Sequence, residues 1–270
     1  MTGALLPVEV VRGEGPVVLG LPHVGTHVPP EIHARLNARG RLLADTDWHV
    51  DRLYAGLLPG ATTVRATFHR YVIDANRAPD DESLYPGQNT TGLVPVTDFD
   101  GVPIWDEVPD AAEIAARREA FHAPYHAALA AELERVHARH GVAILYDCHS
   151  IRGDIPFLFD GRLPDFNIGT AGGTTCAPEV EDIVHRLCAA APGYTSVLNG
   201  RFKGGWTTRH YGRPAEGMHA IQMELAQATH LAAEAPPFAY DEGKAARLRP
   251  VLSRILHALA DLAPSLRSGR

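Results

Sequence analysis

One apolar run constrains the fold of this chain more than any other feature. Val142-Ala143-Ile144-Leu145-Tyr146 follows directly on a segment of helical pattern that ends at Gly141. Five apolar residues without alternation are typical of a strand that is buried on both faces. A helix that leads into such a strand predicts an α/β fold, in which helices cover both faces of one sheet.

The rest of the chain continues this pattern without a repeat, a low-complexity tract or an interdomain linker. We therefore expect residues 1–270 to form a single α/β domain, with a mixed β-sheet flanked by helices. Strands are predicted at 8–11, at 17–21, as a pair across 62–76, at 195–198 and at 219–225. Helices are predicted at 30–38, from Asp45 or Thr46 to about 57, at 111–140 with a break near Pro124, at 178–191, and at 244–263 with a kink at Pro250.

Residues 78–104 form the longest stretch without periodicity. They are rich in Pro, Gly, Asp, Asn and Thr. A loop of this length inside a compact domain is usually functional. We expect it to be a substrate or lid loop.

Composition excludes several classes of partner. The 270 residues carry 32 acidic and 25 basic side chains, a net charge of −7, and no run rich in Lys and Arg. Such a chain has no electrostatic reason to bind nucleic acid or an anionic membrane. It has no leader pattern, no uninterrupted stretch of 18 apolar residues and no CxxC pair among its three cysteines, so we expect a cytoplasmic protein.

The number of histidines, fifteen, raises the question of metal or proton chemistry. A chain of this length buries enough apolar surface to fold without a structural metal, so a bound metal should serve catalysis. His210 is a candidate substrate contact. Surface or packing roles suffice for the histidines on predicted helices, which are His33, His122, His126, His137, His185 and His257.

Polar side chains stand where three of the predicted strands end. His23 follows the second strand, Asp147 and His149 follow the apolar run, and Glu224 lies within the last strand. Ligands of open α/β sheets bind at the carboxyl ends of strands, so we expect these groups to meet in one crevice. Asp147 and His149 are two residues apart and share a face of their strand, as do Gln222 and Glu224.

Two imidazoles and one carboxylate, with one position left open, are the usual ligands of a catalytic zinc ion. His23 and His149 are the candidate imidazoles. Asp47 and Asp51 lie four residues apart on one face of a predicted helix, and either is a candidate third ligand. The ion is expected to be Zn²⁺ or another divalent transition metal. The alternative roles are a solvated or capping histidine, a helix-terminal Asp47 and an ion-paired Asp51.

Three further features point to hydrolysis of an anionic substrate. Glu224 lies inside an apolar strand and is a candidate general base, the alternative being a structural ion pair. Asn76 and Arg77 place an amide beside a five-donor guanidinium, which suits a substrate carboxylate, although Arg77 would equally tether a loop. The segment 201–212 combines cations, hydroxyls and glycines and is predicted to be an anion-contacting loop.

These residues fall into a series of motifs that resembles the N-formylglutamate amidohydrolase family. The resemblance implies a three-layer α/β sandwich of the zinc carboxypeptidase-like (phosphorylase/hydrolase-like) type. The motifs run in order from about residue 20 to residue 231 and are Pro22-His23-Val24-Gly25-Thr26-His27-Val28-Pro29, Thr46-Asp47-Trp48 through Asp51-Arg52-Leu53, Val72-Ile73-Asp74-Ala75-Asn76-Arg77, Asp147-Cys148-His149-Ser150, Gly204-Gly205-Trp206-Thr207-Thr208-Arg209 and Gln222-Met223-Glu224.

The resemblance assigns roles to several of these residues. It implies that His23 and His149 are the imidazole ligands and that Glu224 is the base. It also implies that the amide of Asn76 and the guanidinium of Arg77 clamp the substrate carboxylate.

The third ligand departs from the wider pattern. Zinc carboxypeptidases have a Glu three residues after the first His, where this chain has Thr26. The carboxylate ligand must therefore come from elsewhere in the chain. The family pattern favours Asp47 over Asp51.

The reaction that the resemblance implies is hydrolysis of N-formyl-L-glutamate to L-glutamate and formate, the last step of a histidine-degradation route. Glu224 would take a proton from the attacking water and return it to the departing nitrogen. The substrate is a dianion, so two cationic contacts are expected: Arg77, and either Arg209 or, as second choice, Lys203. The alternative is a related zinc deacylase that acts on another N-acyl amino acid or on a peptide.

Overall fold

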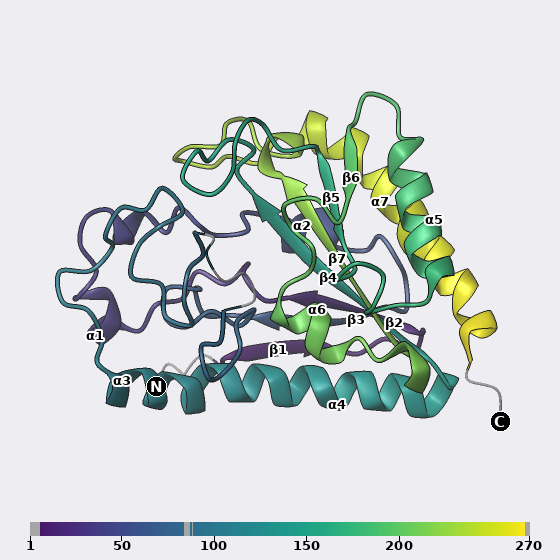
Figure 1. The fold of residues 1–270 in the computed structure, drawn as a ribbon, viewed down its shortest axis with the longest axis horizontal. Helices are drawn as coiled ribbons and strands as arrows, with labels where there is room; N and C mark the ends of the chain where they lie inside the picture. Colours follow the sequence, from purple (N-terminus) through teal and green to yellow (C-terminus); the bar gives the residue numbers. More distant parts are fainter. Residues whose placement is uncertain (1–5, 84–86, 88, 268–270) are drawn as a thin grey trace.

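The computed structural model describes residues 6–83, 87 and 89–267, and one seven-stranded sheet forms its centre (Figure 1). The order of the strands is β1-β3-β2-β4-β7-β5-β6. β3, β2, β4 and β7 are parallel to one another, whereas β1 and β5 are antiparallel to their neighbours β3 and β7. The sheet is therefore mixed, as predicted. Its strands are β1 (Val8–Val11), β2 (Val17–Leu21), β3 (Thr62–Ala66), β4 (Ala143–Ile151), β5 (Phe166–Gly169), β6 (Ser196–Leu198) and β7 (Met218–Ala226).

Helices cover both faces of the sheet, which makes three layers. Apolar side chains of α2, α5 and α7 pack on one face, and those of α4 pack on the other, with α6 against β4 and β7. In Figure 1, α4 runs below the sheet while α5 and α7 lie at its right. The α-helices are α1 (Pro30–His33), α2 (Val50–Tyr54), α3 (Ala111–Arg117), α4 (Ala123–His140), α5 (Pro178–Ala189), α6 (Trp206–Tyr211) and α7 (Glu242–Leu262).

Burial on both faces explains the apolar run at 142–146. All nine residues of β4 are buried. Ile144, Tyr146 and Cys148 belong to the core beneath α5 and α7, whereas Ala143 and Leu145 belong to the core beneath α4. The strand continues beyond the apolar run through Asp147 and His149, which face the α4 side by the same alternation.

The strand pair predicted across 62–76 is wrong in its second half, because only Thr62–Ala66 forms a strand. The segment that follows is irregular, and side chains from the helical segment 111–140 bond its carbonyls. Arg117 Nη1 donates to Val72 O at 3.1 Å, and His126 Nε2 lies 2.8 Å from Ala75 O. These bonds satisfy the backbone without a neighbouring strand.

Several predicted helices differ in extent. The helices expected at 30–38 and 45–57 are confined to α1 and α2, and His49 has a φ of +61°, which ends any helix before Val50. The break expected near Pro124 is present as a π-helical turn, η2 (Arg118–His122), between α3 and α4. Neither β5 nor α6 was predicted, and α6 lies in the segment expected to be a loop.

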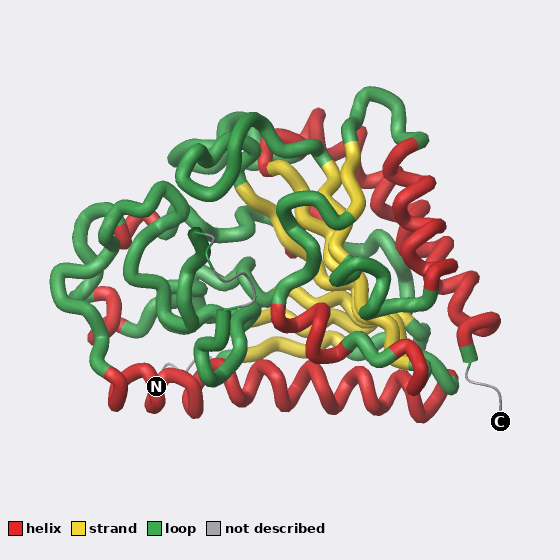
Figure 2. Tube along the Cα trace, in the orientation of Figure 1, coloured by secondary structure: helices red, strands yellow, loops and turns green. Residues whose placement is uncertain are grey.

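Long loops gather at one end of the sheet, drawn in green in Figure 2. The described part of 78–104 contains no helix and no strand of the sheet, as predicted. Among the described residues, no helix is both long and apolar enough to cross a membrane.

Candidate active site

Three of the strand ends singled out from the sequence meet in space. β2, β4 and β7 are adjacent and parallel, so their carboxyl ends lie at one edge of the sheet. His23 comes two residues after β2, His149 lies in β4, and Glu224 in β7 is the register partner of His149. The sheet itself thus brings the three side chains to one place.

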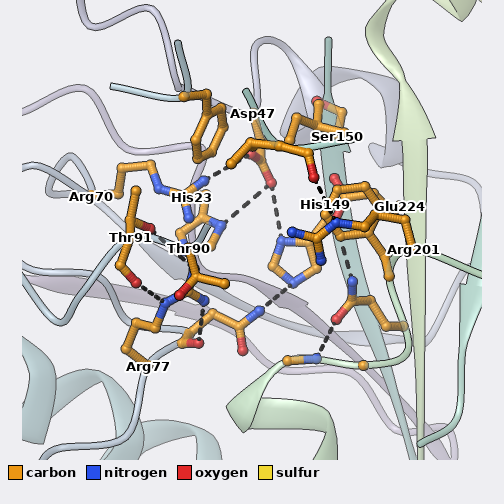
Figure 3. A pocket seen from close by; sticks show the side chains of 18 of the residues that line it. His23, Asp47, Arg70, Arg77, Thr90, Thr91, His149, Ser150, Arg201 and Glu224 are labelled. Atoms are coloured by element: carbon orange, nitrogen blue, oxygen red, sulfur yellow. Dashed lines mark hydrogen bonds and ion pairs between the residues drawn. The ribbon is translucent and has the colours of Figure 1, made fainter. Parts of the chain in front are cut away.

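Ligand atoms of three buried residues converge there (Figure 3). Asp47 Oδ2 lies 3.2 Å from His149 Nδ1 and 3.7 Å from His23 Nδ1. One such atom from each of the three residues lies within 4.8 Å of the others. Two imidazoles and a carboxylate in this arrangement are a donor set that suits zinc.

A second carboxylate lies beside each imidazole. Asp74 Oδ1 lies 2.7 Å from His23 Nε2, and Asp147 Oδ1 lies 3.1 Å from His149 Nε2. An ionised carboxylate only accepts hydrogen bonds, so the bond to Asp74 places a proton on His23 Nε2. Nδ1 of each ring and an oxygen of Asp47 therefore meet at one point, which suits a shared proton or a metal ion. Carboxylates behind metal-binding histidines are the usual outer partners of such sites.

Charge around this set keeps its carboxylates ionised. Burial alone would raise the pKa of Asp47, but hydrogen bonds with His149 and His23 hold it below its usual value. Burial also opposes ionisation of Asp74, whose pKa Arg70 and His23 keep well below its usual value. Arg70 Nη2 donates to Asp74 Oδ2 at 2.6 Å, so the guanidinium acts on His23 through Asp74.

Glu224 supplies a buried carboxyl beside the set, and Gln222 fixes it. Burial raises the pKa of Glu224 above its usual value. Gln222 Nε2 donates to Glu224 Oε2 at 3.2 Å, while Gln222 Oε1 accepts the Gly205 N–H at 2.7 Å. A backbone N–H only donates, which determines the orientation of the amide. A held carboxyl of raised pKa suits proton transfer near neutral pH.

Asn76 and Arg77 form another part of the site. Asn76 Oδ1 accepts the Thr207 N–H at 2.9 Å, and its Nδ2 lies 3.3 Å from His149 Nε2. Arg77 Nε donates to Thr91 O at 2.8 Å and its Nη2 to Thr91 Oγ1 at 3.1 Å. Residue 91 belongs to the loop at 78–104, so Arg77 connects the site to that loop.

The metal-ligand candidates, Glu224 and the Asn76–Arg77 pair border one cavity, whose empty volume of about 660 Å³ includes space open to solvent. Arg70, Arg77 and Arg201 line it together. Arg201 Nε donates to Leu158 O at 3.0 Å, and its Nη2 donates to Asn89 O at 3.1 Å. Figure 3 shows Arg77 and Arg201 on different sides of the cavity. The lining therefore carries positive charge in a protein of net negative charge.

Comparison with known proteins identifies the family of this chain. The family model described as N-formylglutamate amidohydrolase matches residues 15–231. The chain belongs to the N-formylglutamate amidohydrolase family. A relative from Pseudomonas aeruginosa named N-formylglutamate deformylase is 48% identical over 252 residues, which are 92% of this chain and 94% of that protein. One of the same name from Pseudomonas putida is 45% identical over 251 residues, 92% and 93% of the two chains.

The fold of the family is also seen in a solved structure. The N-formylglutamate amidohydrolase of Ralstonia eutropha JMP134 is 30% identical and superposes with a TM-score of 0.82. The match covers 97% of this chain and 99% of the other. The three-layer α/β fold predicted for this member of the amidohydrolase family is thereby confirmed.

The two candidate carboxylates for the third ligand lie in different surroundings. Asp47 is 1% exposed and lies between the two imidazoles. The Asp51 side chain is 39% exposed and forms an ion pair with Arg65 at 3.0 Å. Asp51 lies on α2, outside the cavity of this amidohydrolase.

The predicted cationic contacts are only partly brought together. Arg77 lines the cavity, whereas neither Arg209 nor Lys203 is among its described lining residues. Arg209 Nε donates to Gly204 O at 3.0 Å, so it holds a residue of the cavity wall. Arg201 lies in the segment predicted to contact anions, but nothing in its spacing distinguishes it from the other cations there.

Asp74 and Arg70 had no predicted role. A charged residue inside Val72-Ile73-Asp74-Ala75 is the signal that the sequence contained for Asp74. Arg70 shows no comparable signal, because its ion pair with Asp74 depends on the irregular path of the chain after β3.

Proposed function

We propose that the protein hydrolyses N-formyl-L-glutamate to formate and L-glutamate. The observation that carries this proposal is one cavity with a His23–Asp47–His149 set, a buried Glu224 and guanidinium groups along its walls. The relatives named N-formylglutamate deformylase support it, since each matches more than nine-tenths of this chain.

His23 Nδ1, the Asp47 carboxylate and His149 Nδ1 would hold a divalent cation, Zn²⁺ or another transition metal. Such an ion supplies Lewis-acid polarisation of the formyl carbonyl and makes water more acidic. Asp74 holds the His23 ring in the tautomer that presents Nδ1, and Asp147 Oδ1 lies 3.1 Å from His149 Nε2. The ionised Asp74 adds negative charge behind His23 and so favours binding of a cation.

Glu224 is the general base in this proposal. Its carboxylate takes a proton from the attacking water and returns a proton to the nitrogen of glutamate as the C–N bond breaks. Gln222 holds the carboxylate by one oxygen and so limits its rotation. The balance is one water consumed and one amine and one formate released.

The substrate carries two carboxylates, and the cavity offers separate cationic groups for them. We assign the α-carboxylate to Arg77 with Asn76, as the sequence led us to expect. For the second carboxylate the lining favours Arg201 over Arg209 or Lys203. Arg209 then supports the wall at Gly204. A neutral substrate would leave a cavity-lining guanidinium without its anion, which is costly.

The loop at 78–104 has a place in this scheme as a substrate loop. Residues Asn89, Thr90 and Thr91 line the cavity. Asn89 and Thr91 bond the two arginines that we assign to the carboxylates. The loop thus forms a wall against which the substrate would lie.

A formate-release assay tests the proposal. Purified protein, with its metal content measured, is given N-formyl-L-glutamate and N-formyl-L-glutamine in parallel. We expect formate from the dianion, and a kcat/KM for the monoanionic glutamine compound lower by about a hundredfold or more. An absence of formate release from metal-loaded protein would contradict the activity, and equal rates would contradict the assignment of two cationic contacts.

A further inference from the structure

A row of side chains on one helical segment bonds the backbone that carries Asn76 and Arg77. Arg117 Nη1 donates to Val72 O, and Arg118 Nη1 donates to Pro79 O at 3.3 Å. His122 and His126 lie one helical turn apart on the same side of the helix. The carbonyls that they bond lie between those of Val72 and Pro79.

The two histidines bond the carbonyls on either side of Asn76. His126 Nε2 lies 2.8 Å from Ala75 O, and His122 Nε2 lies 3.0 Å from Arg77 O. A carbonyl oxygen only accepts hydrogen bonds, so each ring must donate. Two ring N–H donors one helical turn apart thus bond two backbone carbonyls that are two residues apart. The backbone is therefore held on both sides of Asn76.

Burial keeps the inner ring in the state that this bond requires. Burial lowers the pKa of His126 to about 3, so the ring is neutral and has one donor and one acceptor. With Nε2 donating to Ala75, Nδ1 accepts, and the Tyr211 hydroxyl lies 3.0 Å from it. The ring is therefore held on both sides.

The same cluster reaches α6, which bonds the Asn76 side chain. The Trp206 ring packs edge-on against His126, with ring centroids 4.7 Å apart. The next residue, Thr207, donates its N–H to Asn76 Oδ1. A Cβ at Gly205 would lie 2.3 Å from Asn76 Nδ2, so this end of the helix has no room for a larger residue.

We propose that His122 and His126 are positioning residues for substrate binding, which set the Asn76–Arg77 pair at the place where the substrate carboxylate binds. The inference rests on the proposed function, because it needs an anionic substrate at Arg77. Neither histidine is among the described residues that line the cavity, so both act through the backbone that they bond. The π-helical turn η2 ends at His122 and shifts the position of this residue around the helix relative to α3. This shift turns the His122 ring toward Arg77 O.

Paired substitutions on the metal-loaded enzyme test this role. His122→Phe and His126→Phe keep ring size but remove the donor, whereas His122→Gln and His126→Gln keep an N–H at a similar reach. We expect each Phe variant to raise KM for N-formyl-L-glutamate about tenfold, with kcat and metal content within about twofold to threefold of the wild type. The Gln variants should recover most of the KM.

A matched control is His219→Phe. His219 is also buried, and its Nδ1 accepts one backbone bond, from Ala177 N–H, at the opposite end of β7. The control should leave KM unchanged. If it raises KM as much as the variants at His122 and His126, those effects report general destabilisation and the inference is wrong.

A double-mutant cycle with Arg77→Ala distinguishes positioning from structure. If the histidines act through Arg77, adding His122→Phe or His126→Phe to Arg77→Ala should change KM by less than about twofold. Full additivity would overturn the inference, as would an unchanged KM in the single Phe variants. If one Phe variant does not fold, the other decides. Loss of formate release by the wild type would instead reject the proposed function.

Discussion

His149 and Glu224 are direct register partners on the parallel strands β4 and β7. Adjacent strands lie about 4.8 Å apart, so the sheet sets the distance between a proposed metal ligand and the proposed base. Both residues are buried, and both side chains point to the α4 face. No loop movement is needed to bring these two groups together.

We predict that Glu224→Gln retains the metal but loses most of its turnover. The amide preserves size and the neighbouring bond with Gln222 but cannot take a proton. We expect kcat to fall by about 10²–10⁴-fold, measured as formate release beside metal analysis. Glu132→Gln is the control, because Glu132 is a buried glutamate on α4 that pairs with Arg12 and Arg135. Retention of activity by Glu224→Gln would remove Glu224 from the mechanism.

We predict that Asp47→Ala abolishes metal binding and that Asp51→Ala does not. Asp47 lies between the two imidazoles, whereas Asp51 pairs with Arg65 at the surface. Metal content after dialysis, measured by atomic absorption, decides between them. The reverse result, metal lost only with Asp51→Ala, would refute the ligand assignment.

Asp74→Asn should weaken metal binding without removing a ligand. The amide no longer enforces the tautomer of His23, and Arg70 loses its ionic partner. We expect the metal dissociation constant to rise about 10–100-fold in a chelator competition. Asp98→Asn, at another buried carboxylate that pairs with an arginine, Arg39, serves as the control. Equal affinities for Asp74→Asn and the wild type would show that the carboxylate does not tune the site.

Arg201→Ala should impair recognition of the substrate more than Arg209→Ala. Arg201 lines the cavity and Arg209 supports Gly204. We expect Arg201→Ala to raise KM for N-formyl-L-glutamate at least tenfold. The ratio of kcat/KM for N-formyl-L-glutamate to that for N-formyl-L-glutamine should fall. Arg209→Ala should reduce activity on both substrates by the same factor. A loss of preference only in Arg209→Ala would restore Arg209 as the second contact.

The stability of the metal-free protein should depend on pH partly through His126. Burial, with His122 as an added repulsion, lowers the pKa of His126 to about 3, whereas an unfolded histidine has a pKa of about 6.5. The contribution of the neutral His126 ring to the free energy of unfolding is thus fully present above about pH 6.5. It is lost as the pH falls toward 3, by up to about 1.4 kcal/mol per pH unit. His126→Gln should reduce the slope of unfolding free energy against pH between 6 and 4, measured in urea. Parallel slopes would contradict a neutral buried ring.

The sequence predicted most of the sheet because burial leaves a pattern. The run at 142–146 and the alternation in Asp147–His149 and Gln222–Glu224 depend only on which faces of β4 and β7 are covered. Their meeting at one edge followed from parallel strands. These are local signals, and the structure agrees with them.

Other features depend on contacts between distant segments and left no local pattern. The chain after Ala66 leaves the sheet because side chains of another segment, such as Arg117, bond its carbonyls. The choice of Arg201 over Arg209 as a cavity residue depends on where α6 begins, and the sequence did not predict this helix. Local pattern alone did not separate Asp47 from Asp51; the family pattern favoured Asp47, and the start of α2 at Val50 places Asp51 on that helix.

The most direct test of the account is to measure kcat/KM for N-formyl-, N-acetyl- and N-succinyl-L-glutamate side by side, on metal-loaded protein of known metal content. One extra methyl group in a closely fitted acyl site changes kcat/KM by about 10–200-fold. We expect the formyl compound to be preferred at least tenfold over both others. Equal or faster hydrolysis of the acetyl or succinyl compound would contradict it and identify another N-acyl amino acid deacylase.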